Sequence, residues 1–557
     1  MHKRTITAIA LLALGILFWP QGTKQYDTVI YGGGFAGCAA AGRASEYAPQ
    51  HRVLLIVPET VEMLGGLGTT GGQNFADIRL WKKELTAQGS FARWFADAGQ
   101  FYNTEKMAEV IAEDLKRYPN LEVLFGYELN QVSRIGKNIG SVKLGRVLRD
   151  ELEGLVWDKP EMRIKGKVFI DASDEGRLAR LSGVQLSVGR QDWPEQYLTA
   201  SERDAGMGYQ QAATLMFKVR NVKTPAEPGN YGEWVFSRDH NGSWGLAGGK
   251  ATWSGTRELI AFNQKYAAQG FAIKPINAAQ DGTESSEWWV NTLLVFDVDA
   301  RMRSLDKETN RFPRHIQKQL TIEEAWLKAK EFIKNPDFMD ALRRFSLEAH
   351  GQKYGFGSAE LVLDEDGEPV TGASLYIRES VHAIQGGPTS PQGIEGKDGA
   401  YALNISEAQL AGDSKDMGSD RDLYPSRIGL GYYLMDINAY RPEDLQHEGK
   451  YVWPVTEWLR PDWLRSGGEP SCPVYLPYAI LTSPDVDNLL LPGYAASCSS
   501  FAWAELRVLP NLAVLGDAAG IAAARSMNFG ELPGDFGDIQ IKWMQERLLE
   551  TGARLEK

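Results

Sequence analysis

The segment Tyr26–Glu46 reads YDTVIYGGGFAGCAAAGRASE and places a Gly-x-Gly-x-x-Gly motif between an apolar strand and a helix of small residues. Gly32 permits a tight turn, Gly34 lets the backbone approach a diphosphate, and Gly37 lets the helix pack closely on the strand. The helix N-terminus favours an anion there, because its N–H groups are unpaired and its dipole is positive. The sequence therefore predicts a dinucleotide site at this turn.

The pattern on both sides of the glycines supports this prediction. We expect a strand at Asp27–Tyr31, a helix at Ala36–Ser45 and a second strand at Arg52–Val57. This order forms the βαβ unit in which the motif binds a dinucleotide, whereas a bare glycine-rich turn would need no ligand.

A carboxylate that binds the ribose usually follows the glycines by about 20 residues. In this chain Val57 and Pro58 occupy the end of the second expected strand, so the acid is displaced. Glu59 is the candidate for this role and Glu62 is the alternative. Either residue could instead be a solvated loop carboxylate.

Composition narrows the classes of function. At 557 residues the chain is long enough for two or more domains, and its net charge of −12 with a pI near 5.3 argues against a nucleic-acid partner. The three cysteines form no C-x-x-C motif, so we expect no dithiol relay, no iron–sulfur cluster and no metal site. A small-molecule substrate is the expected partner.

Residues 1–22 resemble an export signal. His2, Lys3 and Arg4 form a basic start, and Ile6–Trp19 is an apolar run of 14 residues, short for a bilayer span of about 20. No clear cleavage site follows, so an uncleaved N-terminal anchor is the alternative. We expect an exported protein, periplasmic or extracellular, whose membrane contact is limited to this segment.

The two ends of the chain share an α/β pattern. After an expected helical region at Phe91–Arg117, the pattern predicts three strands in the N-terminal part, at Leu121–Phe125, Tyr127–Val132 and Lys167–Asp171. The C-terminal part shows expected strands at Asn488–Pro492 and Leu512–Leu515, then a helix at Ala518–Ser526. We predict that residues 25–190 and 485–557 form one nucleotide-binding domain, and that residues 191–484 form a substrate or cap domain.

The C-terminal motif Gly516-Asp517-Ala-Ala-Gly520 is expected to be the turn between that strand and that helix. Asp517 could accept a hydrogen bond from a sugar-alcohol hydroxyl, while the helix N-terminus would face a ring that becomes anionic on reduction. Alternatively, Asp517 is simply the helix N-cap.

Four segments together resemble the FAD-dependent oxidoreductases of the glutathione-reductase-type fold, and most closely the FAD-dependent oxidoreductase family distantly akin to fumarate reductase and succinate dehydrogenase flavoproteins. They are Gly32–Gly37, Leu64–Gly72, Phe169–Gly176 and Asn488–Ala524. The resemblance implies an α/β fold with a Rossmann-like FAD-binding domain assembled from both chain ends, and an inserted mixed α+β substrate domain. It covers both ends well and the middle only in patches.

The same resemblance implies the cofactor residues. The diphosphate would lie on Gly32, Gly33, Gly34, Phe35, Ala36 and Gly37, and the isoalloxazine along Gly65, Gly66, Thr69, Thr70 and Gly71. Asp171 would end the strand below the cofactor, and Gly516, Asp517 and Gly520 would bind its ribityl and pyrimidine edges. The succinate dehydrogenase group attaches its flavin covalently through a His in the region of this loop. No His lies between His51 and His240 in this chain, so the resemblance implies that FAD is bound without a covalent bond.

The segment Tyr376–His382 resembles the family's Arg-Glu-Thr strand, which faces the flavin. Strand alternation puts Arg378 and His382 on one face, where a neutral imidazole could act as a base. Alternatively, Arg378 pairs with Glu379 and His382 is a satisfied buried residue. Arg507 could orient a carboxylate or stabilise reduced flavin; its alternative is a salt bridge to Glu505 or Asp517.

Three functions remain open. The first is hydride transfer between FAD and a small polar substrate, a carbinol or amine such as a sugar, with electrons leaving to an unidentified acceptor. The second is reduction of an activated alkene, as in fumarate reductase. The third is a protein that binds FAD or a glycan without turnover.

Overall fold

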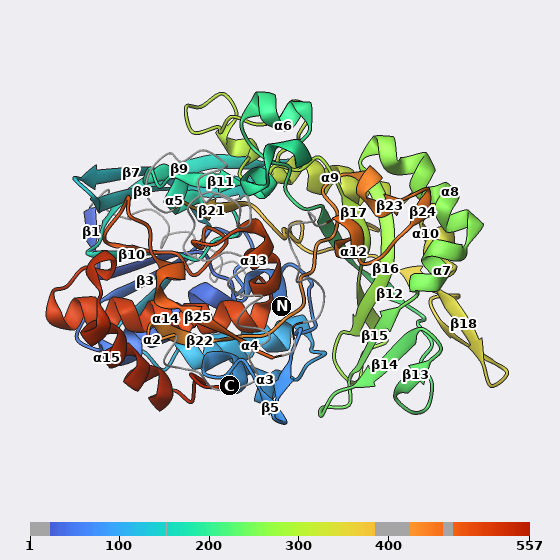
Figure 1. Cartoon of the computed structure of the whole chain (residues 1–557), viewed down its shortest axis with the longest axis horizontal. Coiled ribbons are helices and arrows are strands. Elements are labelled where there is room, and N and C mark those ends of the chain that lie inside the picture. The colour runs from blue at the N-terminus through green and yellow to red at the C-terminus, as the bar shows by residue number, and fades with distance from the viewer. Residues whose placement is uncertain (1–22, 152, 385–423, 460–469, 471) are drawn as a thin grey trace, which may run out of the picture.

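The computed structural model describes residues 23–151, 153–384, 424–459, 470 and 472–557, and these form a mixed α/β protein (Figure 1). Residues 1–22, on which the prediction of an export signal or anchor rests, lie outside the described residues.

A five-stranded parallel sheet carries the βαβ unit. Its strand order is β26-β10-β2-β3-β6. The bounds are Thr28–Tyr31 for β2, Val53–Val57 for β3, Leu121–Phe125 for β6, Val168–Asp171 for β10 and Leu489–Leu490 for β26. Each of the first four lies within one residue of its predicted bounds. Because β26 pairs with β10, the C-terminal part of the chain completes a sheet that the N-terminal part begins.

Helices cover one face of this sheet and a second sheet covers the other. The helices are α2 (Phe35–Tyr47), α4 (Thr104–Leu115) and α14 (Leu509–Phe529), and the second sheet has the order β1-β9-β8-β7. Along β2, Ile30 packs towards the helices, while Val29 and Tyr31 pack towards the second sheet. Both faces of the parallel sheet are thus buried, which explains its continuous apolar strands. The bounds of the second sheet are Thr23–Gln25 for β1, Tyr127–Ile135 for β7, Asn138–Arg149 for β8 and Leu155–Lys165 for β9.

The middle of the chain builds a seven-stranded antiparallel sheet on the right of Figure 1. In spatial order its strands are β13 (Gly229–Tyr231), β14 (Trp234–Arg238), β15 (Trp244–Gly248), β16 (Phe271–Gln280), β17 (Glu287–Val295), β12 (Ala213–Arg220) and β20 (Glu360–Leu361). The helices beside it are α7 (Lys250–Gly255), α8 (Arg257–Tyr266), α9 (Ile322–Phe332) and α10 (Pro336–Arg343).

Shorter elements connect these sheets. The other α-helices of the described residues are α3 (Ser90–Ala98), α5 (Arg177–Leu181), α6 (Ala200–Ala205), α12 (Thr456–Leu459), α13 (Ser500–Leu506) and α15 (Asp538–Glu550). Two-stranded pairs are β4 (Leu80–Trp81) with β5 (Glu84–Leu85), β11 (Leu186–Val188) with β21 (Val381–Ala383), β18 (Ser346–Ala349) with β19 (Gln352–Gly355), β22 (Arg427–Gly431) with β25 (Val474–Pro477), and β23 (Gln446–His447) with β24 (Lys450–Tyr451).

One predicted helical region is divided in the structure, and one predicted strand is wrong. The helical region Phe91–Arg117 is two helices, α3 and α4, because the chain turns at Gly99 with a φ of +92° and the Asn103 side chain caps α4. The predicted strand Leu512–Leu515 lies inside α14, which runs unbroken from Leu509 to Phe529.

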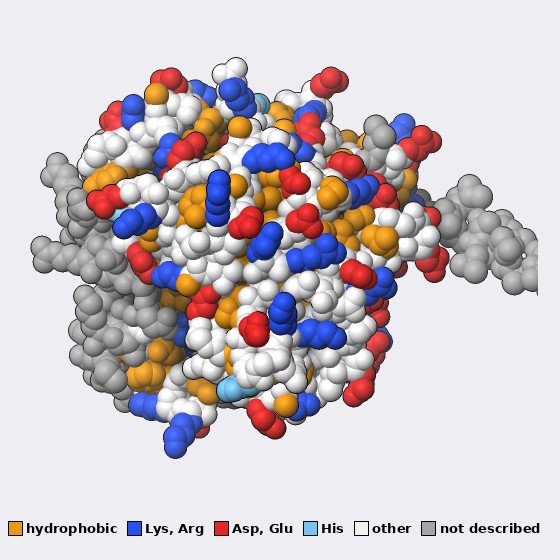
Figure 2. Space-filling model, turned by 90° about the vertical axis from the view of Figure 1, so that its right-hand side faces the viewer, with side chains coloured by type: hydrophobic (Ala, Val, Ile, Leu, Met, Phe, Trp, Pro, Cys, Tyr) orange, Lys and Arg blue, Asp and Glu red, His pale blue; other side chains and the backbone are white. Residues whose placement is uncertain are grey.

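The surface and the helices bear on possible partners. On the face shown in Figure 2, Lys and Arg side chains are interspersed with Asp and Glu side chains. Among the described residues, no single helix is both long and apolar enough to cross a bilayer, and α13 with α14 passes only as a pair bent by 100°.

Candidate functional site

Close contacts require glycine at two positions of the turn between β2 and α2. Gly32 follows β2 with a φ of +109°, a conformation that favours glycine. A Cβ at Gly32 would lie 2.6 Å from the Ala172 carbonyl oxygen, and a Cβ at Gly37 would collide with the Gly32 carbonyl oxygen. The turn therefore packs against the chain that follows β10 and leads directly into α2.

Gly34 is different, because neither its conformation nor its neighbours require a glycine. Its φ is −72°, and a Cβ there would meet no protein atom within 4 Å. Gly34 is the N-cap of α2, and no side chain caps that helix. The empty space and the uncapped N–H groups together fit a phosphate at the helix N-terminus.

The second glycine-rich loop lies directly on this turn. The Gly65 N–H donates to the Gly33 carbonyl oxygen at 2.9 Å. A Cβ on Gly66 would lie 3.1 Å from the Gly34 Cα. The loop that the family resemblance assigns to the isoalloxazine is therefore continuous with the predicted diphosphate site.

The two threonines of this loop differ in their surroundings. The Thr69 hydroxyl donates to the Leu64 carbonyl oxygen at 2.6 Å and is buried, so it holds the loop together. The Thr70 hydroxyl donates to the Gly66 carbonyl oxygen at 3.1 Å, and Thr70 and Gly71 line a cavity.

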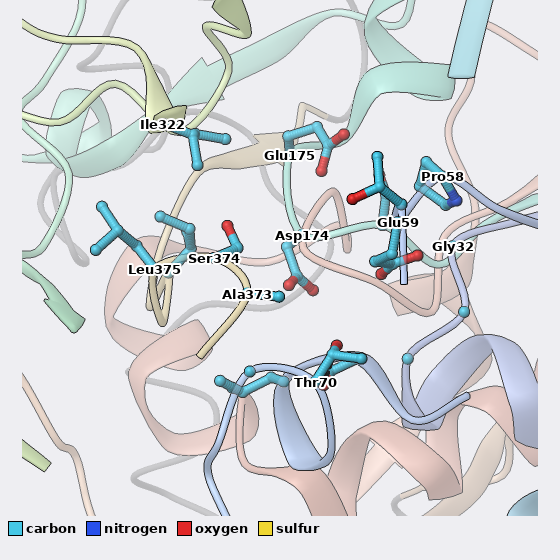
Figure 3. A pocket seen from close by; sticks show the side chains of 18 of the residues that line it. Gly32, Pro58, Glu59, Thr70, Asp174, Glu175, Ile322, Ala373, Ser374 and Leu375 are labelled. Carbon is cyan, nitrogen blue, oxygen red and sulfur yellow. Dashed lines mark hydrogen bonds between the residues drawn. The ribbon is translucent and has the colours of Figure 1, made fainter. Parts of the chain in front are cut away.

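This cavity lies between the turn after β2, the end of β3, the turn after β10, α9 and residues 373–377 (Figure 3). The predicted cofactor residues that line it are Gly32, Gly33, Gly34, Glu59, Gly66, Thr70 and Gly71. A second hollow shares Gly34 with the cavity and adds Phe35, Ala36, Gly65 and, from α14, Leu509 and Leu512.

Glu59 has the position predicted for the ribose ligand. It follows β3, and its Oε2 is buried with no hydrogen-bond partner among the described residues. Burial raises the pKa of Glu59 to about 7. A ribose hydroxyl that donates to Oε2 would satisfy this orphaned oxygen. The alternative, Glu62, is exposed and lies outside the cavity.

Asp174 is a cavity residue that the sequence prediction missed. It lines both hollows, and burial together with Glu175 and Glu59 raises its pKa to about 8. Figure 3 shows Glu59, Asp174 and Glu175 in the same part of the cavity. The available signal was its place after β10, since polar residues that follow parallel strands gather at one edge of the sheet.

Asp171 supports the turn from below instead of lining the cavity. Its Oδ1 accepts from the Ser173 N–H at 3.1 Å and the Ser173 hydroxyl at 2.6 Å, and its Oδ2 accepts from the Ala179 N–H at 2.8 Å. Both carboxylate oxygens are therefore used within the protein.

Three predicted cofactor residues of the C-terminal part lie elsewhere. Asp517 accepts from the N–H and the hydroxyl of Ser90 at 2.8 and 2.5 Å and pairs with Arg43 at 3.2 Å. Gly516 and Gly520 lie at the crossing of α14 with α2, where a Cβ would collide with a backbone carbonyl oxygen. Their predicted role at the cofactor is corrected to a packing role, because the expected turn is part of a helix.

Arg378 and Arg507 meet at Tyr376. The Arg507 Nη1 donates to the Tyr376 hydroxyl at 2.7 Å, and its Nη2 pairs with Asp436 at 2.8 Å. The Arg378 Cζ lies 4.4 Å from the centre of the Tyr376 ring. Tyr376 forms a buried cluster with Met216 and Trp289, and Leu67, which lines both hollows, packs against this cluster. The two arginines therefore lie on the side of Tyr376's cluster that the predicted flavin loop shares.

The alternative pairings of these arginines are wrong. Arg507 pairs with Asp436 and not with Glu505 or Asp517. Arg378 donates to the Ala212 carbonyl oxygen at 2.8 Å, while the neighbouring Glu379 accepts from the Gln211 N–H at 3.0 Å.

His382 is enclosed on β21 and lines neither hollow. Its ring centre lies 5.8 Å from that of Trp503, and its Nε2 lies 3.7 Å from the Glu379 Oε1. Neither ring nitrogen has a hydrogen-bond partner among the described residues. Burial lowers the pKa of His382 to about 4, so the imidazole is neutral at pH 7. The expected strand over Tyr376–His382 is limited to Val381–Ala383.

Three solved structures resemble the chain at low identity. The p-nitrophenol 4-monooxygenase PnpA of Pseudomonas putida DLL-E4 has 11% identity and a TM-score of 0.24 over 49% of this chain and 57% of its own length. The myxobacterial FAD-dependent halogenase CndH has 14% identity and a TM-score of 0.29 over 66% of this chain and 71% of its own length. P. aeruginosa PqsL, in complex with 2-aminobenzoylacetate, has 12% identity and a TM-score of 0.32 over 94% of this chain and 92% of its own length.

No curated protein matches the sequence. The family model described as FAD dependent oxidoreductase matches residues 27–548, which includes the βαβ unit, the middle sheet and α14. This chain therefore belongs to the family of FAD-dependent oxidoreductases, and FAD is its cofactor.

Proposed function

We propose that this flavoenzyme binds FAD without a covalent bond and transfers a hydride between the flavin and a small polar substrate. The substrate would be a carbinol or an amine, with sugars among the candidates. The observation that carries the proposal is the cavity that joins the uncapped N-terminus of α2 to the loop Gly65–Gly72. When bound there, FAD supplies a two-electron hydride acceptor or donor.

The residues of the cavity fit the parts of FAD. The open space at Gly34 would hold the diphosphate, and the unpartnered oxygen of Glu59 would accept from the adenosine ribose. Asp174 lies beside the same helix N-terminus; in its protonated form it would donate to the cofactor without adding negative charge. The chain as described offers no His in the loop to act as a tether.

We also propose the predicted division into domains. Residues 25–190 and 485–557 would form the FAD-binding domain, supported by the pairing of β26 with β10. Residues 191–484 would form the substrate domain, supported by the separate antiparallel sheet. Export, with membrane contact only through residues 1–22, is proposed from the basic start and apolar run of that segment.

His382 is our candidate for the group that accepts the substrate proton. Burial lowers its pKa to about 4, so the imidazole is neutral at pH 7 but is a weak base. We expect His382→Ala to slow the reduction of flavin by substrate in a single turnover while FAD stays bound. An unchanged rate would exclude His382 from the mechanism. That outcome would agree with the position of His382 outside the lining of both hollows.

The proposed reaction is tested by anaerobic titration of the purified yellow protein with sugars, amines and hydroxy acids. Bleaching of the flavin by one of these donors supports the proposal, and candidate quinones or oxygen then identify the acceptor by reoxidation. The second candidate is an alkene reductase, favoured by the gathering of Arg378 and Arg507 at Tyr376. It predicts instead that an unsaturated acid reoxidises chemically reduced flavin.

A further inference from the structure

Arg303 joins the middle part of the chain to the turn after β10 at the wall of the cavity. Its Nε pairs with the Glu323 Oε1 of α9 at 2.6 Å, and its Nη1 lies 3.5 Å from the Glu175 Oε1. All three residues line the cavity, and the Arg303 side chain is 16% exposed. The guanidinium is therefore held between two carboxylates while part of its surface faces the cavity.

Both carboxylate partners are themselves fixed by hydrogen bonds. The Glu323 Oε2 accepts from the Ser304 N–H at 2.7 Å. The Glu175 Oε1 lies 3.2 Å from the hydroxyl of Tyr31, the last residue of β2, and that hydroxyl donates to Glu128 of β7 at 2.5 Å. The positive charge between these carboxylates is therefore held at a fixed place beside the turn that follows β2.

The charge of this arginine reaches the two carboxyl groups that we expect beside the cofactor. The Glu59 Oε2 has no hydrogen-bond partner among the described residues, and Asp174 lines both hollows. Burial raises the pKa of both carboxyl groups, and Arg303 opposes this rise in each. The titratable side chains around Arg303 are Glu59, Glu128, Arg149, Asp174, Glu175 and Glu323, together with the neutral phenol of Tyr31.

An acidic cavity is a poor place for an anionic cofactor unless a cation offsets the charge. Four carboxyl side chains line the cavity, those of Glu59, Asp174, Glu175 and Glu323. The diphosphate of FAD is negative, so these groups repel it when they are ionised. The N-terminus of α2 offers only about half of a unit positive charge. Arg303 offers a whole one, because a guanidinium does not lose its proton in a protein.

We propose that Arg303 retains FAD in the cavity through its charge, as a positioning residue that the middle part of the chain contributes to the cofactor site. The inference rests on the proposed place of FAD and deepens it, because residues 191–484 would hold the cofactor as well as the substrate. The ion pair with Glu175 crosses from the proposed substrate domain to the proposed FAD-binding domain. Loss of this charge should therefore weaken FAD binding without any change in the Gly-x-Gly-x-x-Gly motif.

The first test removes the charge. Apoprotein is titrated with FAD at pH 7, and quenching of flavin fluorescence gives the dissociation constant. We expect Arg303→Met to bind FAD about tenfold to a hundredfold more weakly, and Arg303→Lys, which keeps the charge, to stay within about threefold of the native protein. The matched control is Arg311→Met, because Arg311 pairs with Asp306 at 3.2 Å, is 22% exposed in its side chain and lines neither hollow. The control should bind FAD as the native protein does.

The second test removes a carboxylate partner instead. Glu323→Gln takes away one negative charge of the cavity and leaves Arg303 in place, so we expect it to bind FAD about tenfold more tightly. If the pair only held the wall together, the same change would weaken binding. Glu324→Gln is the control, because Glu324 of the same helix pairs with Lys307 and does not line the cavity. Glu323→Gln decides the question even if Arg303→Met does not fold.

The third readout is the pH profile of FAD binding, which a purely structural role would not move. Without the nearby cation, Asp174 should keep its proton to a higher pH, so the alkaline loss of FAD affinity in Arg303→Met should begin at a higher pH than in the native protein. An unshifted profile, undiminished binding by Arg303→Met or weaker binding by Glu323→Gln would overturn the role of Arg303. In each of those cases the native protein still takes up FAD, whereas a native protein that takes up none would overturn the proposed function itself.

Discussion

At the scale of single residues, Gly34 is a glycine that the predicted diphosphate site requires and the fold does not. Its backbone conformation suits any residue, and a Cβ there points into open space. We expect Gly34→Val to fold with a free energy of unfolding within about 0.5 kcal/mol of that of the FAD-stripped native protein. The variant should be colourless, because the added methyl groups occupy the place of the diphosphate.

Flavin absorbance after purification and thermal unfolding measure the two expectations for Gly34. The matched control is Gly255→Val at the end of α7, where a Cβ also meets no atom within 4 Å. The control should keep its colour. A full flavin spectrum in Gly34→Val would show that the diphosphate lies elsewhere.

Asp174 should make FAD affinity depend on pH. Its pKa of about 8 lies above the ordinary value, and the neutral form suits a neighbouring diphosphate better than the anion does. Binding is therefore favoured below pH 8. Above pH 8 the affinity for FAD should fall about tenfold per pH unit, because binding requires the proton on the Asp174 carboxyl group. Titration of apoprotein with FAD between pH 6 and 10 measures this slope.

The Asp174→Asn variant should hold its FAD affinity constant over that alkaline range. Asp97→Asn is the control, because Asp97 is an exposed residue of α3. The pKa of Glu59 is about one unit lower, so Glu59 is the cavity residue that we expect to cause a dependence that persists in Asp174→Asn below pH 8. A slope above pH 8 that is the same in both variants would exclude Asp174 as its source.

At the scale of elements, the crossing of α2 and α14 holds the predicted diphosphate helix in place. A Cβ on Gly516 would collide with the Ala36 carbonyl oxygen in the first turn of α2. We expect Gly516→Ala to reduce the free energy of unfolding by about 1–3 kcal/mol through overpacking and to weaken FAD binding by displacing that turn.

Denaturant unfolding and FAD titration of Gly516→Ala check both effects. The matched control is Gly42→Ala, since a Cβ there lies 3.4 Å from the Leu115 side chain, an ordinary contact. Its helix should gain up to about 1 kcal/mol from the better propensity of alanine. Equal stability of the two variants would mean that the helices can separate without cost.

The same two helices show what sequence patterns could and could not predict. β2, β3, β6 and β10 were predicted within one residue, because apolar runs of four or five residues between turns are typical of buried parallel strands. Leu512–Leu515 has the same appearance, but it belongs to a helix whose residues from Leu509 to Ser526 are all buried. A helix without an exposed face loses the 3.6-residue polar pattern that would identify it.

At the scale of the whole molecule, the cavity joins segments that no local pattern connects. The glycines and Glu59 were predicted, because a motif with fixed spacing marks them. Arg303 and Trp326 also line the cavity, and Lys274 joins Arg378 at Asn291. A single residue on a strand, helix or loop carries no such signal, so these partners follow only from the tertiary structure.

Because its walls come from the first turn, the middle helix α9 and residues 373–377, bound FAD should stabilise the chain as a whole. A ligand that binds only the folded state adds RT ln(1 + [L]/Kd), about 2.7 kcal/mol when FAD is at a hundredfold excess over Kd. We expect FAD-stripped protein to melt at a lower temperature than the FAD-loaded protein, and added FAD to raise the melting temperature as its concentration increases. Tryptophan fluorescence measures both transitions. Gly34→Val should show no such response. If stripped and reconstituted protein melted alike, the walls would not depend on FAD, and the cavity would not be the place where the cofactor joins the two parts of the fold.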